Sequence, residues 1–289
     1  MLVGLISLST GALLDWALGP CRGKNTGEQA LFRQRMPRLH TGDIVLADRY
    51  DCNYFTVALL VQRGVDLVTR QHPRQITDFQ RGQRLGRRDH RGDWRRPKRP
   101  DWMDAETYAA MPERLLMRET EVGGRVLVTT LTDAKTVSGP DMGAAYDRRW
   151  QVEVDLRSIQ AEMGMDILRT RSAPMVDKEI AVYLLAYNRI CALMVRAAAG
   201  LGRRPRALSF KGTVQLYLAF AQPFRFAVDA CVQTMTAHLL GGISALRRPV
   251  RPGRVEPHAI KRRPKNHQLL TVTWAVARRN IWQARGAPA

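Results

Sequence analysis

One segment near the middle of the chain combines two stripes of side chains at helical spacing. The first stripe is apolar and comprises Ala145, Val152, Leu156, Ile159 and Met163. The second is polar, with one carboxylate between guanidinium groups one helical turn away on either side, and comprises Tyr146, Arg149, Glu153, Arg157 and Gln160. We therefore predict one helix over 146–160 whose apolar stripe faces the core. The polar stripe has two interpretations. It is either a solvated face, with Arg–Glu pairs contributing roughly a few tenths of a kcal/mol each, or a functional surface.

Before this segment, short apolar runs alternate between strand-like and helix-like patterns. The predicted elements are strands at 2–9 and 12–18 that turn at Thr10 and Gly11, a helix at 27–39 with Thr26 as its N-cap, a strand at 43–47, a helix at 52–63 and a strand at 65–69. This alternation predicts an α/β fold in which helices flank a mixed sheet. Active groups in such sheets lie at the carboxyl ends of strands, and Asp48 is placed there.

From 71 to 100 the periodic pattern gives way to a basic stretch that contains several prolines and glycines. These residues exclude a long helix, so we predict strands and loops. The clustered cations are either merely solvated or form a phosphate-contacting surface, and the interleaved Trp94 favours the second interpretation. The candidate DNA-binding residues of this stretch are Arg95, Arg96, Lys98 and Arg99. A strand pair at 115–120 and 125–131 is predicted to follow.

The C-terminal third is predicted to be mostly helical. Two apolar-rich helices are expected over 176–199 and 214–239, with their apolar residues packed in a core. No apolar run reaches the roughly 18 residues that are needed to span a bilayer. The stretch 247–265 is rich in Lys, Arg and Pro, which predicts an irregular segment that either follows phosphates or is a solvated tail.

Composition narrows the possible classes of function. The 289 residues include 46 Lys plus Arg against 26 Asp plus Glu, and the formal net charge of +20 indicates a polyanionic partner, nucleic acid first and a membrane surface second. The widely spaced cysteines suggest neither a disulfide framework nor a zinc site, which fits a reducing cytoplasm. The histidines form no zinc-hydrolase motif, and without a P-loop no nucleotide cofactor is expected.

The polar stripe has the spacing Tyr-x2-Arg-x3-Glu-x6 followed by a long polar residue. It resembles the signature helix of DDE transposases of the insertion sequence 4 family, in which the last position is usually Lys and here is Gln160. Further stretches look like the same family in the same order, namely TGDIVLADRYDCNYFTVALLVQRGVDLVTR, DFQRGQRLGRRDHRGDWRRPKRPDW, AAYDRRWQVEVDLRSIQAEMGMDILRTRSAPMVDKEIAVYLLAYNRI and RPGRVEPHAIKRRPK. The resemblance implies a ribonuclease-H-like domain at 1–200 with a mainly β insertion at about 71–132, a helical part at 201–246 and a basic tail at 247–289.

The resemblance also implies a site and a chemistry. Asp48 and Glu153 would be catalytic residues that bind Mg²⁺ or Mn²⁺, since hard cations prefer carboxylate oxygens and two such ions promote in-line displacement at phosphorus. The residues implied to bind DNA in the helix are Tyr146, Arg149, Arg157 and Gln160. The expected partner is double-stranded DNA at transposon ends, with a homodimer as the active form, no membrane and a bacterial cytoplasmic location.

Enzymes of this kind use three carboxylates, the first at the end of the first strand, and no residue before Asp48 fits that position. Asp43 begins the strand that Asp48 ends, so at roughly 3.3 Å per residue it lies well over about 10 Å from the site. Asp15 falls inside a predicted strand. We therefore expect the first strand and its Asp to be missing, as in an N-terminally truncated transposase that binds DNA without cutting it.

Three alternatives remain open at this point. The chain is an active transposase, a non-catalytic DNA-binding remnant that competes with a full-length transposase, or an unrelated basic α/β protein that binds RNA. Cleavage with a divalent metal separates the first two, and a preference for duplex ends over RNA separates both from the third.

Overall fold

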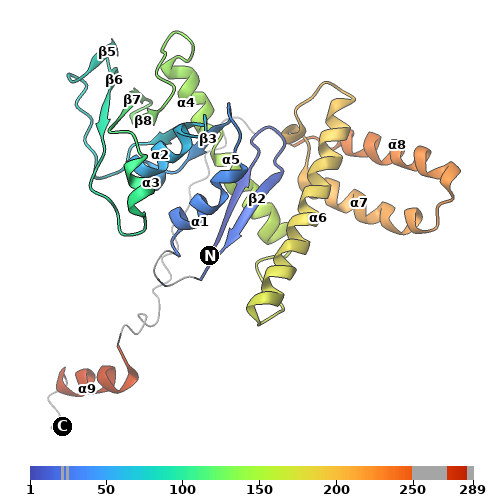
Figure 1. The fold of residues 1–289 in the computed structure, drawn as a ribbon. Helices are drawn as coiled ribbons and strands as arrows, with labels where there is room; N and C mark the ends of the chain where they lie inside the picture. The colour runs from blue at the N-terminus through green and yellow to red at the C-terminus, as the bar shows by residue number, and fades with distance from the viewer. Residues whose placement is uncertain (21–22, 24–25, 249–271, 285–289) are drawn as a thin grey trace. The chain divides into compact units, whose positions relative to one another are not determined.

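The computed structural model of the chain describes residues 1–20, 23, 26–248 and 272–284 (Figure 1). The chain divides into two compact units, Met1–Arg248 and Pro249–Ala289. The described residues of the second unit contain helix α9 (Trp274–Ala284). The predicted irregular basic stretch lies outside the described residues from 249 onward.

The predicted N-terminal hairpin is confirmed. Strands β1 (Leu2–Ile6) and β2 (Leu13–Leu18) pair antiparallel and form a two-stranded sheet of their own. Gly11 in the connecting turn has a φ of 83°, a left-handed conformation that glycine adopts without steric cost.

Helix α1 (Glu28–Arg35) follows the hairpin, as the sequence predicts. The prediction of Thr26 as its N-cap was wrong, because Gly27 occupies that position and no side chain caps the helix. The Thr26 hydroxyl group instead donates a hydrogen bond of 2.9 Å to the carbonyl oxygen of Gly23. The Thr26 side chain therefore bonds outside the helix and does not cap it.

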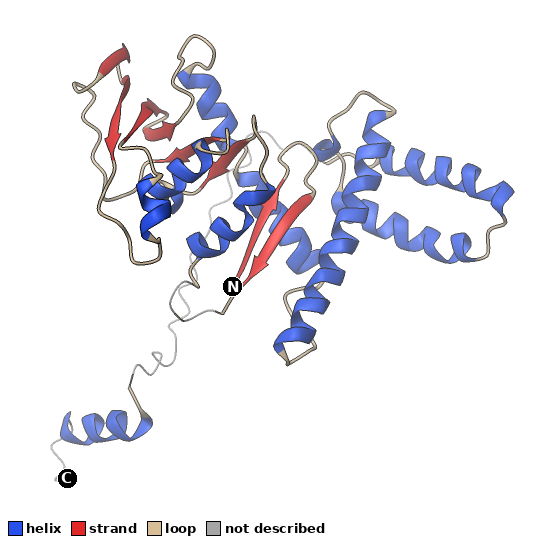
Figure 2. Cartoon of the chain, in the orientation of Figure 1, coloured by secondary structure: helices blue, strands red, loops and turns tan. Residues whose placement is uncertain are grey.

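Six further strands form a mixed sheet in the order β3-β4-β8-β7-β6-β5 (Figure 2). Their bounds are β3 Ile44–Ala47, β4 Asp66–Arg70, β5 Gln83–Gly86, β6 Asp89–Arg95, β7 Arg114–Val122 and β8 Arg125–Thr129. Strands β3 and β4 are parallel and are connected through α2 (Tyr54–Val61), whereas the other neighbours are antiparallel. Because β8 pairs with β4, the β-rich stretch 71–132 continues the same sheet. The predicted α/β class with helices around a mixed sheet is confirmed.

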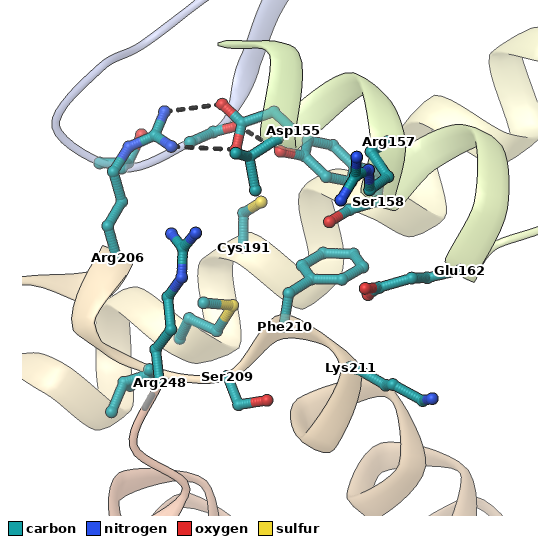
Figure 3. Close-up of a pocket in the computed structure, with 16 residues that line it drawn as sticks. Asp155, Arg157, Ser158, Glu162, Cys191, Arg206, Ser209, Phe210, Lys211 and Arg248 are labelled. Atoms are coloured by element: carbon teal, nitrogen blue, oxygen red, sulfur yellow. Dashed lines mark hydrogen bonds and ion pairs between the residues drawn. The ribbon is translucent and has the colours of Figure 1, made fainter. Parts of the chain in front are cut away.

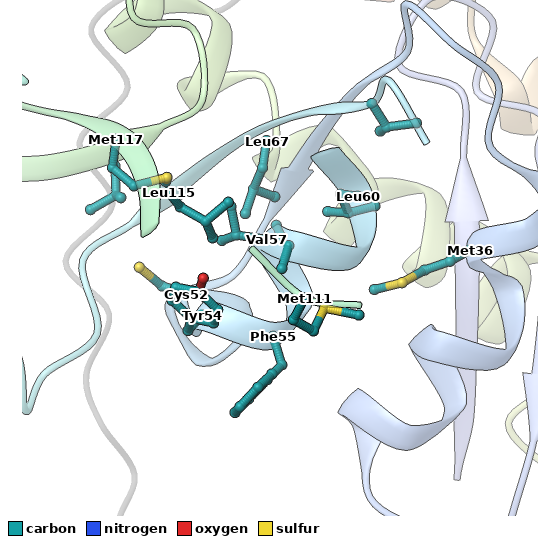
Figure 4. Close-up of a cluster of buried hydrophobic side chains, with 14 of the residues drawn as sticks. Met36, Cys52, Tyr54, Phe55, Val57, Leu60, Leu67, Met111, Leu115 and Met117 are labelled. Carbon is teal, nitrogen blue, oxygen red and sulfur yellow. The ribbon is translucent and has the colours of Figure 1, made fainter. Parts of the chain in front are cut away.

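Helices pack on both faces of this sheet, because adjacent residues on a strand point to opposite sides. On β4, Leu67 packs in the same cluster as Val57 of α2 (Figure 4), whereas its neighbour Val68 packs with Met142 of α4 (Gly139–Asp147). All four side chains are almost completely buried, and each such burial stabilises the fold by about 1.5–3 kcal/mol. The sheet therefore lies between α2 and α4.

The prediction of one continuous helix over 146–160 was wrong. Helix α4 ends at Asp147, α5 (Trp150–Arg157) begins after a break, and a π-helical turn (Ser158–Glu162) follows it. At the break the backbone N–H groups of Arg148 and Arg149 donate to carbonyl oxygens three residues back, at 3.1 and 2.9 Å. This tighter turn interrupts the regular ladder of bonds to the fourth residue back.

The C-terminal part of the first unit is helical, with α6 (Ala173–Ala199), α7 (Phe210–Arg225) and α8 (Asp229–Ala245). The prediction of one helix over 214–239 was wrong, because the chain ends α7 soon after Pro223, which has no N–H to continue the helix. Shorter helical segments are η1 Met36–Arg38, η2 Arg49–Asp51, α3 Ala105–Ala109 and η4 Pro205–Ala207.

Helix α6 is long and apolar enough to cross a membrane. No such segment was predicted from the sequence because charged residues such as Asp177 and Arg189 interrupt the apolar residues of this helix. Its buried residues include Leu184 and Ile190, which pack in two apolar clusters of the first unit. A helix buried on one face in this way has the pattern of a core helix.

Candidate functional site

A groove of about 470 Å³ lies between β1 and β3. Residues 3–8 line one side of it and residues 43–48 the other, and side chains of α1 and α5 complete the lining. Val152 and Leu156 of the predicted apolar stripe line this groove and are half-buried, whereas Ile159 is fully buried in a core cluster. The stripe therefore faces the groove at one end and the core at the other.

The edge of β1 that β2 does not cover has free backbone groups. Met1 and Gly19 exchange both backbone hydrogen bonds, at 2.7 and 3.0 Å. Since such bonded pairs alternate along antiparallel strands, the N–H and C=O groups of Leu2 and Gly4 point away from β2. Within the part of the chain that the structure describes, no other strand pairs with β1.

The outer edge of β3 is free in the same way. The backbone N–H of Asp66 donates to the carbonyl oxygen of Asp43 at 2.9 Å, so in this parallel pair the odd-numbered residues of β3 bond to β4. The backbone groups of Ile44 and Leu46 point the other way, and among the described strands only β4 pairs with β3. The groove is thus bordered by two strand edges that can each accept another strand.

Three of the predicted site residues meet at this groove, namely Asp48, Arg149 and Glu153. Asp48 follows β3, and its Oδ1 accepts a 2.5 Å hydrogen bond from the backbone N–H of Arg49, while Thr69 of β4 donates to its carbonyl oxygen at 2.9 Å. Arg149 lies 3.3 Å from the Glu153 carboxylate, whose side chain is 44% exposed. Asp48 and Glu153, which the resemblance implies to be catalytic, therefore line the same groove.

Tyr146 is buried on the face of the sheet that α4 covers. Burial raises the pKa of its phenol, and the nearby Asp48 carboxylate adds to the rise, while the Arg149 guanidinium opposes it. The guanidinium carbon of Arg149 lies 5.8 Å from the centre of the Tyr146 ring. The phenol therefore stays protonated and remains a hydrogen-bond donor beside Asp48.

The other predicted DNA-binding residues of this helix lie elsewhere on its surface. Arg157 is exposed and lines a different pocket, and Gln160 is exposed in the π-helical turn. Neither lines the groove between β1 and β3. The tighter turn and the π-helical turn shift the helical spacing, so the polar stripe does not form one continuous face.

In the basic stretch, two of the four candidate residues have partners within the protein. Arg96 donates to the carbonyl oxygens of Tyr108 and Met111 at 2.9 and 2.7 Å. Arg99 donates to the carbonyl oxygen of Met103 at 2.7 Å. Arg95 and Lys98 are exposed and form no such bond in the described chain, so they remain available to a ligand.

Asp51 is a site residue that the sequence reasoning missed. It lines the groove, it is 9% exposed, and its Oδ1 has no hydrogen-bond partner among the described residues. Burial, followed by the charges of Glu28 and Asp48, raises the pKa of Asp51 to about 7. Its place three residues after Asp48 was the available signal, because residues i and i+3 lie above one another in a 3₁₀ turn.

A buried ion pair on the other side of α5 was also missed. Both carboxylate oxygens of Asp155 accept hydrogen bonds from Arg206, at 2.9 and 2.8 Å. Arg206 also donates to the carbonyl oxygens of Ser7 and Leu8, at 3.1 and 2.6 Å. The pairing links α5, the segment before α7 and the β1–β2 turn, and no local pattern signals it because 51 residues separate the partners.

Helix α6 holds the same hairpin through two polar side chains. Tyr187 donates to the carbonyl oxygen of Gly11 at 2.8 Å, and Asn188 makes two 2.8 Å bonds with the backbone of Leu13. Both polar side chains of this apolar helix are therefore satisfied by hydrogen bonds.

The carboxylates at the groove are of the type that Mg²⁺ and Mn²⁺ prefer, but they do not form a complete metal site. Over the described residues, no group of three or more His, Cys, Asp or Glu side chains is placed to hold a metal ion. Asp48 caps η2, and Glu153 is paired with Arg149. The present donor set therefore does not fit a two-metal centre by itself.

Comparison with known proteins gives two matches. The family model described as "Transposase DDE domain" matches residues 2–189. Over 141 residues the chain is 29% identical to the transposase InsG for insertion sequence element IS4 of Escherichia coli strain K12. This match covers 48% of the chain and 32% of the relative, so the chain spans about a third of the length of that protein.

Asp51 makes a testable contribution to the pH dependence of stability. Its carboxyl group holds a proton up to about pH 7 in the folded chain but ionises near about 3.9 when unfolded, so its stabilising contribution is complete below about pH 4 and is lost as the pH rises through 7. We expect the free energy of unfolding to fall between pH 5 and 8 by about 2 kcal/mol more in the wild type than in Asp51→Asn.

Urea unfolding at both pH values measures this difference. Asp101→Asn, at an exposed position outside the groove, is the matched control and should follow the wild-type profile. The explanation is wrong if Asp51→Asn loses as much stability between the two pH values as the wild type does.

Proposed function

Since the chain belongs to the transposase family with a DDE domain, we propose that the groove between β1 and β3 is its site for DNA strand cleavage and transfer. The observation that carries this proposal is the meeting of Asp48, Tyr146, Arg149 and Glu153 at the carboxyl end of β3. These residues come from separate elements, and they include two carboxylates, a guanidinium group and a protonated phenol. This is a set suited to a phosphodiester and a divalent cation.

The cationic side of the site is suited to a phosphate group. The Nε of Arg149 is buried and has no hydrogen-bond partner among the described residues. An unsatisfied buried donor of this kind costs stability until an acceptor binds. We assign Arg149 to a non-bridging phosphate oxygen of the DNA, with the Tyr146 hydroxyl group as a second donor nearby.

Asp48 and Glu153 are proposed as two of the metal-binding carboxylates. Transposases with a DDE domain generally use divalent metal ions, which activate the attacking oxygen and stabilise the leaving oxygen. A third carboxylate in the position of the family's first Asp is not found among the described residues. Asp51 does not replace it in this proposal, because its raised pKa disfavours the charged form.

We propose that the groove takes the element that would supply the third carboxylate. A strand between β1 and β3 would bond to the free backbone groups of Leu2 and Gly4 on one side and of Ile44 and Leu46 on the other. It would join the two sheets into one, as in a ribonuclease-H-like domain. If it ran parallel to β3, its last residue would lie beside Asp48.

The described residues therefore support DNA binding better than DNA cutting. We expect this chain to bind duplex DNA and to leave it intact, and it could then compete with a complete transposase for the same DNA. The net charge of +20 favours such binding whether or not the metal site is complete.

A cleavage assay tests the proposed function. Purified chain is incubated with duplex DNA that carries the transposon ends, in Mg²⁺ or Mn²⁺, and both retardation and strand nicking are measured. We expect retardation without nicking. Site-specific nicking that is lost in Glu153→Gln would show that the carboxylates of this chain suffice for cleavage, and failure to bind the duplex would contradict the proposed function itself.

Arg95 and Lys98, the two candidate residues without a side-chain hydrogen bond among the described residues, should contribute to DNA affinity. Because each phosphate contact contributes about 0.9 to the slope of log affinity against log salt, replacing Arg95 and Lys98 together by Ala should lower that slope by about 1.8. The matched control removes the same charge from the exposed residues Arg189 and Arg196 of α6. If both double variants lower the slope equally, the basic stretch contributes only to the overall charge.

A further inference from the structure

A second pocket, of about 280 Å³, lies on the other side of α5 (Figure 3). Its lining comes from α5 and the π-helical turn, from α6, from the start of α7 and from the segment after α8. None of its residues lines the groove between β1 and β3, although both cavities border α5. An α-helix with its side chains is about 10–12 Å thick, so the two cavities are close neighbours.

The lining of this pocket contains more cationic than anionic side chains. The four cations in the lining are Arg157, Arg206, Lys211 and Arg248, and the two carboxylates are Asp155 and Glu162. The bidentate bond between Arg206 and Asp155 neutralises one pair. Three cations and one carboxylate remain, and none of these four forms an ion pair within the described chain.

Arg248 is directed into the pocket. Figure 3 shows its guanidinium group extending toward Asp155, and the charge of Arg248 is one of the influences that oppose the burial-driven rise in the pKa of Asp155. Asp155 already accepts one hydrogen bond from Arg206 on each of its oxygens, and among the described residues no hydrogen bond or ion pair joins Arg248 to it. The Arg248 guanidinium therefore has donors left for an anion that enters the pocket.

The lining also contains apolar side chains. Met194, Leu208 and Phe210 line the pocket, and Leu208 is almost completely buried, whereas Arg157, Lys211 and Arg248 are exposed. The volume equals about nine water molecules, which suits a small anion and its hydration better than a drug-sized ligand.

We propose that this pocket binds a phosphate group. Arg157, Lys211 and Arg248 come from three different elements and give this pocket an excess of positive charge, and phosphate oxygens accept paired N–H bonds from Arg. The phosphate belongs either to the DNA backbone or to a free phosphate compound. Assignment to DNA depends on the proposed function, since α5 would then hold one DNA phosphate on the side opposite Glu153.

The test compares two double variants that remove the same charge. Lys211→Gln with Arg248→Gln alters the pocket, whereas Arg63→Gln with Arg203→Gln alters exposed residues outside every cavity described above. Thermal unfolding is measured with inorganic phosphate against chloride of equal ionic strength, and DNA binding is measured as a function of salt.

The pocket variant should lose any phosphate-dependent rise in Tm that the wild type and the control variant show. Its DNA-binding slope should fall by about 0.9 below that of the control variant if the ligand is one backbone phosphate. Loss of the Tm effect with an unchanged slope identifies a free phosphate compound as the ligand. If the two double variants behave alike in both measurements, the proposal is wrong.

Replacing the unpaired carboxylate of Glu162 should strengthen phosphate binding. A variant that merely weakened the fold would not produce this gain. Glu162→Gln should raise the affinity for the same phosphate ligand by about two- to fivefold, since it removes a repulsive charge from the lining. An affinity equal to that of the wild type would contradict the proposal. Neither result depends on whether the chain cuts DNA, so this proposal and the proposed function fail separately.

Discussion

The bond between Asp155 and Arg206 is the constraint on which the arrangement of the site depends. Arg206 satisfies both oxygens of a largely buried carboxylate and also donates to the carbonyl oxygens of Ser7 and Leu8. It therefore holds α5 against the turn of the β1–β2 hairpin, while Tyr187 of α6 fixes the same turn through Gly11. Removing one partner of a buried pair leaves an uncompensated charge, at a cost of about 3–5 kcal/mol.

Helix α5 connects this structural constraint with the proposed function, because its residues face two cavities. Glu153, Val152 and Leu156 line the groove beside Asp48, and Arg157 lines the pocket that contains Asp155 and Arg206. A helix held rigidly from one side presents its other side in a fixed orientation. The groove combines this fixed helix with two strand edges that still have hydrogen-bonding capacity.

The sequence predicted those parts of the fold and site that local patterns encode. Asp48 was predicted as a site residue because it directly follows an apolar strand, and Glu153 because its spacing from Tyr146 and Arg149 resembles a family signature. Neither helix break was foreseen: the apolar residues continue past the break between α4 and α5, and the break between α7 and α8 follows Pro223. Asp155 and Arg206 were missed for another reason, because a long-range ion pair leaves no periodic signal. Asp51 lay within reach of local reasoning, as the i+3 neighbour of Asp48 in a 3₁₀ turn.

The central claim is that the Asp155–Arg206 pair orients α5, and with it Glu153, against the hairpin that borders the groove. Hydrogen exchange measured by mass spectrometry on the full chain tests this claim most directly, with Arg206→Gln compared with the wild type. We expect faster exchange of backbone amides in both the β1–β2 hairpin and α5, with the six-stranded sheet unchanged. Faster exchange confined to the residues next to position 206, with the hairpin and α5 as protected as in the wild type, would contradict the claim.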